Sequence, residues 1–567
     1  MPRPLFRVLA AAALLAAVPV TTPGEDAADL LMVRGVFHPV ATPEPVTGSL
    51  AVRDGAIVYL GPDAGAAAFR GPDTEVIDLA GRAVTPGLID AHSHLAGLGA
   101  ALAQVDLVGT ASYAEVVAAV AAAAAEQPPG TWVRGRGWDQ NDWPEKAFPH
   151  HSELSAAVPD HPVWLTRVDG HAALLNARAL ALLEIDAATA DPPGGRVLRD
   201  EGGAPSGVLI DNAMDLAAGR IDEAPPAEAD RRLEAAARYA VARGLTTVTD
   251  MGVDAATIES YRRLRDAGRL PLRAALFLTD SAPLLADWFA RGPEIDPAGR
   301  LTVRGVKLYA DGALGSRGAA LVEPYADDPG NLGLLTAAGD HLREVTARAL
   351  DAGFQVGIHA IGDRGNLVAL DAIEAALAGR GRDGGEAADP RLRVEHFQVA
   401  RLQDVERLAR LGVIASMQPT HATSDMPWAG DRVGERRLAG AYAWRKVLDA
   451  GGRLALGSDF PVERVDPLLG LYAAVTRQDL DGDPPGGWLP EERLSRYEAL
   501  RGFTLDAAYS LFLDHLVGTL EVGKRADLVV FARDPMTVPA AEVPELPIDL
   551  VVVEGEVVHR REAEGAR

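Results

Sequence analysis

The stretch GLIDAHSH, residues 87–94, is a short apolar run that ends in two histidines. Seven further apolar runs of strand length follow it, and Ala- and Leu-rich segments of helical character separate them. The eight predicted strands are 87–92, 246–251, 272–278, 303–309, 354–359, 393–397, 412–418 and 453–458. Strands that alternate with helices form a parallel sheet, and eight of them close a barrel. The sequence therefore predicts an α/β protein built on a (β/α)8 TIM barrel.

The two ends of the chain share a different texture. Short β runs separated by Gly, Pro and Asp turns occupy residues 29–85 and return at 516–567. We expect both ends to build one small composite β-sandwich domain beside a barrel domain at 86–515. The barrel contains one long interruption, at about 100–230, which exceeds what a single loop and helix require. This segment is predicted to fold as an inserted subdomain.

Residues 1–28 have the composition of a leader. Arg3 and Arg7 precede an apolar run from Val8 to Val20, which is too short to span a bilayer and typical of a signal-peptide core. The alternative interpretation is a frayed Ala-rich helix or a mis-assigned start. The signal-peptide hypothesis predicts a periplasmic or secreted protein without a stable membrane span.

The formal net charge is −25, and the chain contains no cysteine. An acidic surface repels phosphate backbones, and no basic stripe interrupts it, so nucleic acid is an unfavourable partner. The lack of cysteine excludes disulfides, thiolate nucleophiles and Cys-based zinc sites. A transition metal must therefore bind to histidine, carboxylate or a modified side chain.

Candidate metal ligands fall at the ends of the predicted strands. His92 and His94 lie two residues apart, so both side chains point to the same face of a strand. This pair alone is weak evidence, because two histidines also occur by chance at a polar strand end. His359, His396 and Asp459 follow three other strands in the same way. Since the carboxyl ends of barrel strands surround one mouth, the five residues together predict a divalent metal site.

Lys307 lies near the end of the fourth predicted strand, in VKLYADG. One interpretation is an ion pair with a neighbouring carboxylate such as Asp311. The other is a desolvated amine that loses its proton and reacts with CO2, which gives an anion able to bridge two cations. The residues by themselves leave both open.

These motifs resemble those of the amidohydrolase superfamily. The relevant runs are VTPGLIDAHSH, KLYADGALGSR, IHAIGDRG, EHFQ, SMQPTH and GSDFPVE. The insert motifs GWDQNDWP and DGHAALLNARAL, with the closing VGTLEVGKRADLVVF, are similar to the amidohydrolase-3 branch, which includes N-substituted formamide deformylase-like proteins. The resemblance extends over nearly everything after the leader, in the same order along the chain.

The resemblance implies a complete ligand set and a mechanism. The implied ligands are His92, His94, Lys307, His359, His396 and Asp459. The first two histidines would bind one ion and the later two another. Carboxylated Lys307 would bridge the ions, and Asp459 would serve as both ligand and general base. The expected cofactor is one or two divalent ions, with zinc as the expected metal.

Further polar residues are candidate substrate contacts, because they lie just past strand ends or in the insert. They are His171, Asp311, Arg317, Asp363, Arg364 and Gln418. For the strand-end residues, the alternative roles are loop capping and surface ion pairs.

The implied reaction is hydrolysis of an amide or other non-peptide C–N bond in a small molecule by a metal-activated water, with Asp459 as the base. A fold does not fix a reaction, so alternatives stay open. The same metal site supports an isomerase or a C–O or C–C hydrolase, and a non-catalytic relative would use the fold for binding alone. The resemblance is also compatible with a homodimer.

Overall fold

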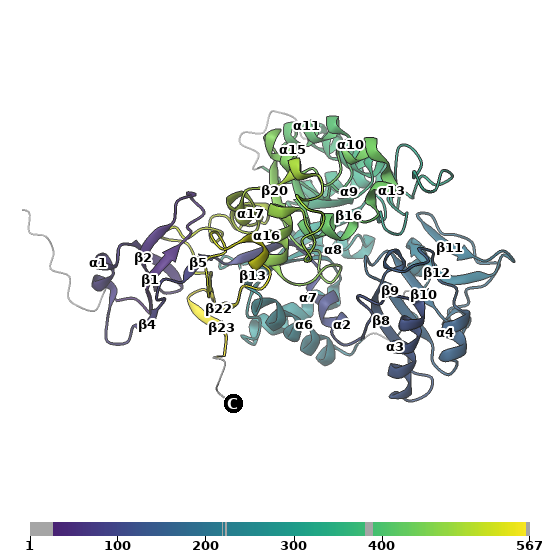
Figure 1. Cartoon of the computed structure of the whole chain (residues 1–567), viewed down its shortest axis with the longest axis horizontal. Helices are drawn as coiled ribbons and strands as arrows, with labels where there is room; N and C mark the ends of the chain where they lie inside the picture. The colour runs from purple at the N-terminus through teal and green to yellow at the C-terminus, as the bar shows by residue number, and fades with distance from the viewer. Residues whose placement is uncertain (1–26, 218, 222–223, 380–388, 563–567) are drawn as a thin grey trace, which may run out of the picture.

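The computed structural model describes residues 27–562 apart from 218, 222–223 and 380–388. The predicted leader, except its last two residues, lies outside the described residues. Figure 1 shows three units: a sheet built from both chain ends, a central barrel, and an inserted sheet with its own helices. Within the described ranges, every helix is too short or too polar to cross a bilayer.

The central unit is an eight-stranded parallel barrel sheet, as predicted, and each predicted strand corresponds to one observed strand. Each strand pairs in parallel with the next one along the chain. The strands are β6 (Leu88–Ser93), β13 (Leu245–Val253), β14 (Arg273–Leu278), β16 (Leu301–Tyr309), β17 (Gln355–Ala360), β18 (Arg393–His396), β19 (Ile414–Met417) and β20 (Arg453–Leu456).

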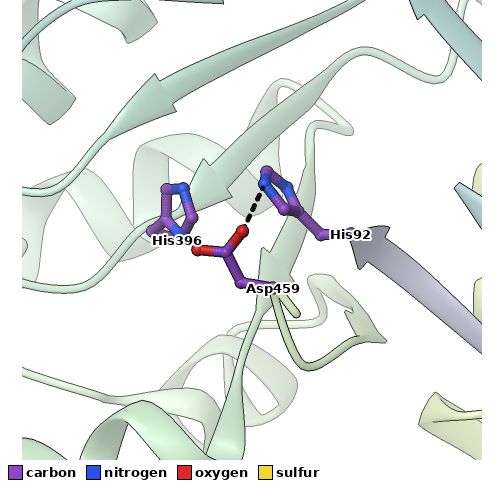
Figure 2. Close-up of side chains that lie close together, drawn as sticks. All are labelled: His92, His396 and Asp459. Atoms are coloured by element: carbon purple, nitrogen blue, oxygen red, sulfur yellow. Dashed lines mark ion pairs between the residues drawn. The ribbon is translucent and has the colours of Figure 1, made fainter. Parts of the chain in front are cut away.

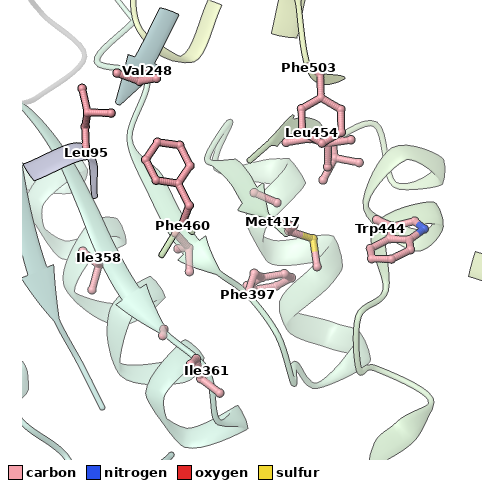
Figure 3. Close-up of a cluster of buried hydrophobic side chains, with 14 of the residues drawn as sticks. Leu95, Val248, Ile358, Ile361, Phe397, Met417, Trp444, Leu454, Phe460 and Phe503 are labelled. Carbon is pink, nitrogen blue, oxygen red and sulfur yellow. The ribbon is translucent and has the colours of Figure 1, made fainter. Parts of the chain in front are cut away.

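Both faces of the barrel strands are buried, which explains their nearly continuous apolar character. Side chains facing inward, such as Ile89 of β6 and Phe277 of β14, pack together inside the barrel. Residues of α18 (Leu505–Ser510) join this inner cluster and close the end opposite the strand carboxyl termini. Side chains facing outward, such as Leu454 of β20, pack beneath the surrounding helices (Figure 3).

These helices cover the barrel; most lie between successive strands, and the last two follow β20. They include α6 (Pro226–Val241), α7 (Ala255–Asp266), α8 (Ala282–Arg291), α9 (Gly339–Asp351), α10 (Asp363–Gly379), α11 (Leu402–Arg410), α15 (Trp444–Asp449), α16 (Pro467–Thr476) and α17 (Arg496–Gly502). Most are amphipathic and bury one stripe against the barrel, whereas α16 is buried on nearly all sides.

The barrel closes at a seam between β6 and β20, the two ends of the hydrogen-bonded strand order. The backbone N–H of Asp459 donates to the carbonyl oxygen of His92 at 2.8 Å. In the same region, the Ser458 hydroxyl donates to Asp90 Oδ2 at 2.6 Å. Two predicted metal ligands therefore also fasten the first strand to the last.

Where a composite β-sandwich was predicted, the structure has one eight-stranded sheet to which both chain ends contribute. Its strands are β1 (Leu30–Phe37), β2 (Val46–Arg53), β3 (Ala56–Gly61), β4 (Glu75–Asp78), β5 (Ala83–Pro86), β21 (Leu528–Phe531), β22 (Ile548–Val553) and β23 (Glu556–Arg560). The two ends join where β5 pairs antiparallel with β21. Alternate residues such as Met32 and Val530 enclose one small core, whereas Val529 faces the barrel core.

The insert lies between α2 (Leu95–Ala101) and α6. Its six strands are β7 (Val105–Asp106), β8 (Val133–Trp138), β9 (Val163–Arg167), β10 (Ala172–Leu175), β11 (Gly195–Arg199) and β12 (Pro205–Asp211). One face packs under α3 (Tyr113–Ala125), and the other under α5 (Ala177–Leu182). In Figure 1 this unit lies to one side of the barrel, on the right of the view.

A glycine-rich loop after β16 fastens the insert to the barrel. A Cβ on either Gly312 or Gly318 would lie 2.4 Å from Asp211 Oδ2, so only glycine permits the approach. Gly315 lies in the same way against the guanidinium of Arg167, another insert residue. This loop brings the end of β12 to the barrel mouth.

Candidate metal centre

Three predicted ligands converge at the carboxyl ends of barrel strands (Figure 2). His92 is the penultimate residue of β6, His396 is the last residue of β18, and Asp459 follows β20. Their ligand atoms all lie within 4.8 Å of one another, and all three residues are buried. His396 and Asp459 adopt positive φ angles of 72° and 61°. Non-glycine residues tolerate that conformation where the surrounding fold imposes it, often at functional sites.

The other predicted ligands surround this group. His94 Nε2 lies 3.2 Å from Asp459 Oδ1. The ring of His359 lies 4.6 Å from the ring of His396, measured between centroids. Lys307 Nζ lies 3.3 Å from His92 Nε2. The structure thus brings all six predicted ligands to one mouth of the barrel.

Three of the histidine rings are oriented through Nδ1. His92 Nδ1 lies 2.7 Å from Glu395 Oε2, His94 Nδ1 lies 3.0 Å from the Met251 carbonyl, and His396 Nδ1 lies 2.8 Å from Gln418 Oε1. Each partner is an oxygen acceptor, so each Nδ1 carries the proton and each Nε2 keeps its lone pair. This is the arrangement by which metal-binding imidazoles are held in proteins.

Glu395 was not among the residues predicted from the sequence. It is fully buried, and the guanidinium of Arg393 donates to both of its oxygens at 2.8 Å. Burial alone would raise the pKa of Glu395, but Arg393 and His92 outweigh it and hold that pKa well below its usual range. A signal was present in RVEH: two opposite charges two residues apart in an otherwise apolar strand.

The charge states of the site suit a divalent cation. Burial lowers the pKa of His92 to about 4, so the ring is neutral at neutral pH. Burial would raise the pKa of Asp459, but the surrounding histidines, His92 first, hold it well below its usual range. Asp459 Oδ1 is buried without a hydrogen-bond donor. Neutral imidazoles around an ionised, unsatisfied carboxylate oxygen fit a metal such as zinc.

Lys307 is buried beside these ligands. Burial lowers the pKa of its amine to about 8. Among the described ion pairs none involves this residue, and its Nζ lies 4.9 Å from the centroid of the Tyr309 ring. The structure therefore gives no ion pair with Asp311, whose carboxylate instead accepts backbone N–H groups of Ala320, Ile361 and Gly362.

The remaining predicted contacts lie in different surroundings. His171 reaches the mouth from the insert, with its Nδ1 2.7 Å from Asp211 Oδ1 and its ring 5.1 Å from that of His359. Gln418 orients His396, as described above. Three others lie outside the cavity linings: Arg317 pairs with Asp327, Asp363 accepts the Val322 N–H, and Arg364 is exposed.

His421 lies in the first turn of α12 (Pro419–Asp425). Its Nε2 is buried without a hydrogen-bond partner and lies 3.7 Å from Asp459 Oδ2. Its ring stacks on that of His396 with 5.8 Å between centroids. An imidazole outside the predicted ligand set thus lies beside the Asp459 carboxylate.

Comparison with known proteins gives matches over most of the chain. Residues 75–559 match a family model described as the amidohydrolase family. Protein LONG AFTER FAR-RED 3 of Arabidopsis thaliana is 36% identical over 527 residues, which cover 91% of this chain and 89% of that protein. A crystal structure described as an uncharacterized metal-dependent hydrolase from Pyrococcus furiosus is 30% identical, with a TM-score of 0.70, covering 90% of this chain and 100% of that one. The fold, the site and these matches define a metal-dependent hydrolase.

Within that class, the chain belongs to the amidohydrolase family, and the resemblance found in the sequence is confirmed. The putative amidohydrolase YtcJ of Bacillus subtilis is 31% identical and covers 87% of this chain and 92% of its own length. N-substituted formamide deformylase of Arthrobacter pascens is 29% identical, and the match covers 94% of this chain and 98% of that protein.

Proposed function

We propose that this hydrolase cleaves an amide or another non-peptide C–N bond, with Asp459 as the general base and zinc as the metal. The observation that carries the proposal is the Asp459 carboxylate. It is held ionised among histidines, and one of its oxygens is buried without a donor. Such a group accepts a proton from a water molecule beside it.

The ligand set proposed to hold the metal is His92, His94, Lys307, His359, His396 and Asp459. One or two divalent ions bound there supply polarisation of the substrate carbonyl and activation of water. The chain's own residues do the rest. Asp459 takes a proton from the attacking water and passes it to the leaving nitrogen, and His421 faces the same carboxylate at 3.7 Å.

We further propose that Lys307 is carboxylated. Its amine is buried, its pKa is lowered to about 8 by burial, and no described ion pair neutralises it. The uncharged amine adds to CO2: a C–N bond forms, the nitrogen loses a proton to solvent, and the product is an anionic carbamate. That anion would add negative charge beside His92, whose Nε2 lies 3.3 Å from the Lys307 amine.

Cleavage of a C–N bond is also supported by one relative. N-substituted formamide deformylase, by its name, removes a formyl group from nitrogen, and the chain covers 98% of its length at 29% identity. We extend to this chain the bond type, not the formyl group.

The test is metal content and hydrolysis measured on one preparation purified without chelators. We expect zinc at one to two equivalents in elemental analysis, and amine release from members of a panel of secondary amides. Matched esters and lactones report the alternative C–O hydrolysis. Turnover of esters without amides would refute the C–N proposal, and metal-loaded protein inactive on every member of the panel would refute hydrolysis of these substrates.

A further inference from the structure

Two open cavities meet at the metal centre, with volumes of about 710 and 750 Å³. Both are lined by Asp459, His359 and His396, and by His171 and Arg136 of the insert. The insert thus forms a wall between two chambers. A substrate whose scissile bond lies beside Asp459 extends one end into each chamber.

The first chamber, of about 710 Å³, is the more polar of the two. The residues that line it alone include Asn212, Thr257, Thr279, Asp280, Tyr309 and Thr336. Hydroxyl, amide and carboxylate groups of this kind hydrogen-bond a polar substituent. This chamber lies between η3 (Asn212–Ala217) of the insert and the ends of β13, β14 and β16.

The second chamber, of about 750 Å³, has an apolar mouth. Leu98, Leu102, Val108 and Tyr239 line it, and Leu102 and Val108 are 50% and 61% exposed. Large apolar side chains gathered around a cavity and left in water indicate a binding site for an apolar group. The mouth lies between α2 and α6 of the barrel and the β7–β8 side of the insert.

Two further carboxylates that line the second chamber, Glu463 and Asp425, lack a cationic partner. Glu463 accepts the Ser424 hydroxyl at 2.7 Å, and Asp425 accepts the Gln398 amide at 2.7 Å. No described Lys or Arg forms an ion pair with either. His421, whose Nε2 has no hydrogen-bond partner, lines the second chamber but not the first. An amine released by hydrolysis is a cation with N–H donors. Burial raises the pKa of both carboxylates, that of Glu463 to about 7, and a cation beside them favours their ionised forms. This chamber therefore complements the amine in hydrogen bonding and, once the amine is bound, in charge.

We propose that the substrate is a secondary amide whose apolar N-substituent occupies the second chamber and whose polar acyl group, larger than formyl, occupies the first. This inference rests on the proposed C–N hydrolysis. The C–N bond breaks, the water oxygen joins the acyl carbon, and the nitrogen gains a proton, which gives a carboxylate and an amine. The amine and its apolar tail then lie against Glu463 and the Val108 mouth.

The first test uses two isomeric amides, N-hexylacetamide and N-methylheptanamide, which carry the same alkyl chain on opposite sides of the bond. We expect kcat/KM to be about tenfold higher for N-hexylacetamide, because its chain reaches the apolar mouth. Val108→Asp should reduce that ratio to about twofold or less. Leu182→Asp is the matched control, since Leu182 is 51% exposed on the insert but lines neither chamber, and it should leave the ratio unchanged. Equal rates, or a preference for N-methylheptanamide, would overturn the assignment.

The second test does not need turnover. Hexylamine binding to the metal-loaded protein is measured by calorimetry, and Glu463→Gln is expected to weaken it about tenfold. Val108→Asp should weaken it as well, and Leu182→Asp should not. If neither amide is hydrolysed, the proposed function fails on these substrates, and the hexylamine data alone decide this inference: affinity that neither Glu463→Gln nor Val108→Asp changes would refute it.

Discussion

Replacement of Glu395 by glutamine should lower both metal affinity and the free energy of unfolding, and a control variant separates the two effects. Glu395 links a buried cation to the ring of His92, a proposed metal ligand. Arg393 donates to both Glu395 oxygens, and His92 Nδ1 lies 2.7 Å from Glu395 Oε2. Glutamine keeps the shape but removes the charge. Partners that orient a metal-binding histidine are typically worth about 10- to 100-fold in metal affinity, so we expect a loss of that size.

The same change leaves the fully buried Arg393 guanidinium without its carboxylate. Breaking one side of a buried ion pair costs about 3–5 kcal/mol, so the free energy of unfolding should fall by that amount. Glu492→Gln is the control. Glu492 is also buried and pairs with Lys446, but it lines neither chamber and contacts no metal-binding residue. It should lose stability without losing metal affinity.

The assays are chelator competition for metal affinity, and chemical unfolding of the metal-free proteins for stability. Metal affinity of Glu395→Gln within about twofold of the wild type would refute the argument that Glu395 sets the orientation and basicity of His92. An equal loss of metal affinity in Glu492→Gln would show that stability alone is responsible.

Four further predictions concern other residues. Lys307→Ala should lose metal and activity, and short carboxylic acids should partly restore both. Lys307→Arg should not be rescued, because a guanidinium stays cationic. Electron density for a bare Lys307 amine in a metal-bound crystal would contradict carboxylation. Asp459→Asn should lower turnover by about 10²–10⁴-fold while most metal stays bound; near-normal turnover would exclude Asp459 as the base. Asp211→Asn should lower kcat/KM with unchanged metal content, because His171 loses the carboxylate that orients it; loss of metal instead would show that His171 and Asp211 contribute to metal binding. Export predicts that native protein starts between about Pro19 and Ala28, and N-terminal sequencing that finds Met1 or Pro2 would contradict it.

The barrel was predictable because each strand carries its own signal. A strand buried on both faces must be apolar along its length, and the polar residue at its carboxyl end marks the mouth, as in FQVGIH and RVEH. The composite sheet was predictable only as a texture. Which strands pair, such as β5 with β21, depends on contacts between residues far apart in the chain.

The site was predictable to the extent that its residues follow strands. His171 and Asp211 belong to the insert, and their approach to the mouth depends on Gly312 and Gly318 in a barrel loop. No local pattern encodes that contact. Glu395 is a different case, because its charge within an apolar strand was visible, but its partner His92 is distant in sequence. The two chambers depend on how the insert packs on the barrel, which periodicity does not reveal.

The antiparallel pairing of β5 with β21 also has a consequence for synthesis. During translation the strands at residues 30–86 leave the ribosome first, yet their sheet lacks β21, β22 and β23 until nearly the entire chain has been made. Closing so long a loop adds little entropic cost, because that cost grows only with the logarithm of loop length. The late synthesis of β21 to β23 therefore postpones completion of the sheet but changes its stability little. The apolar side chains of β1 and β5 therefore lack the part of their core that β21 and β22 supply until the barrel has been synthesised.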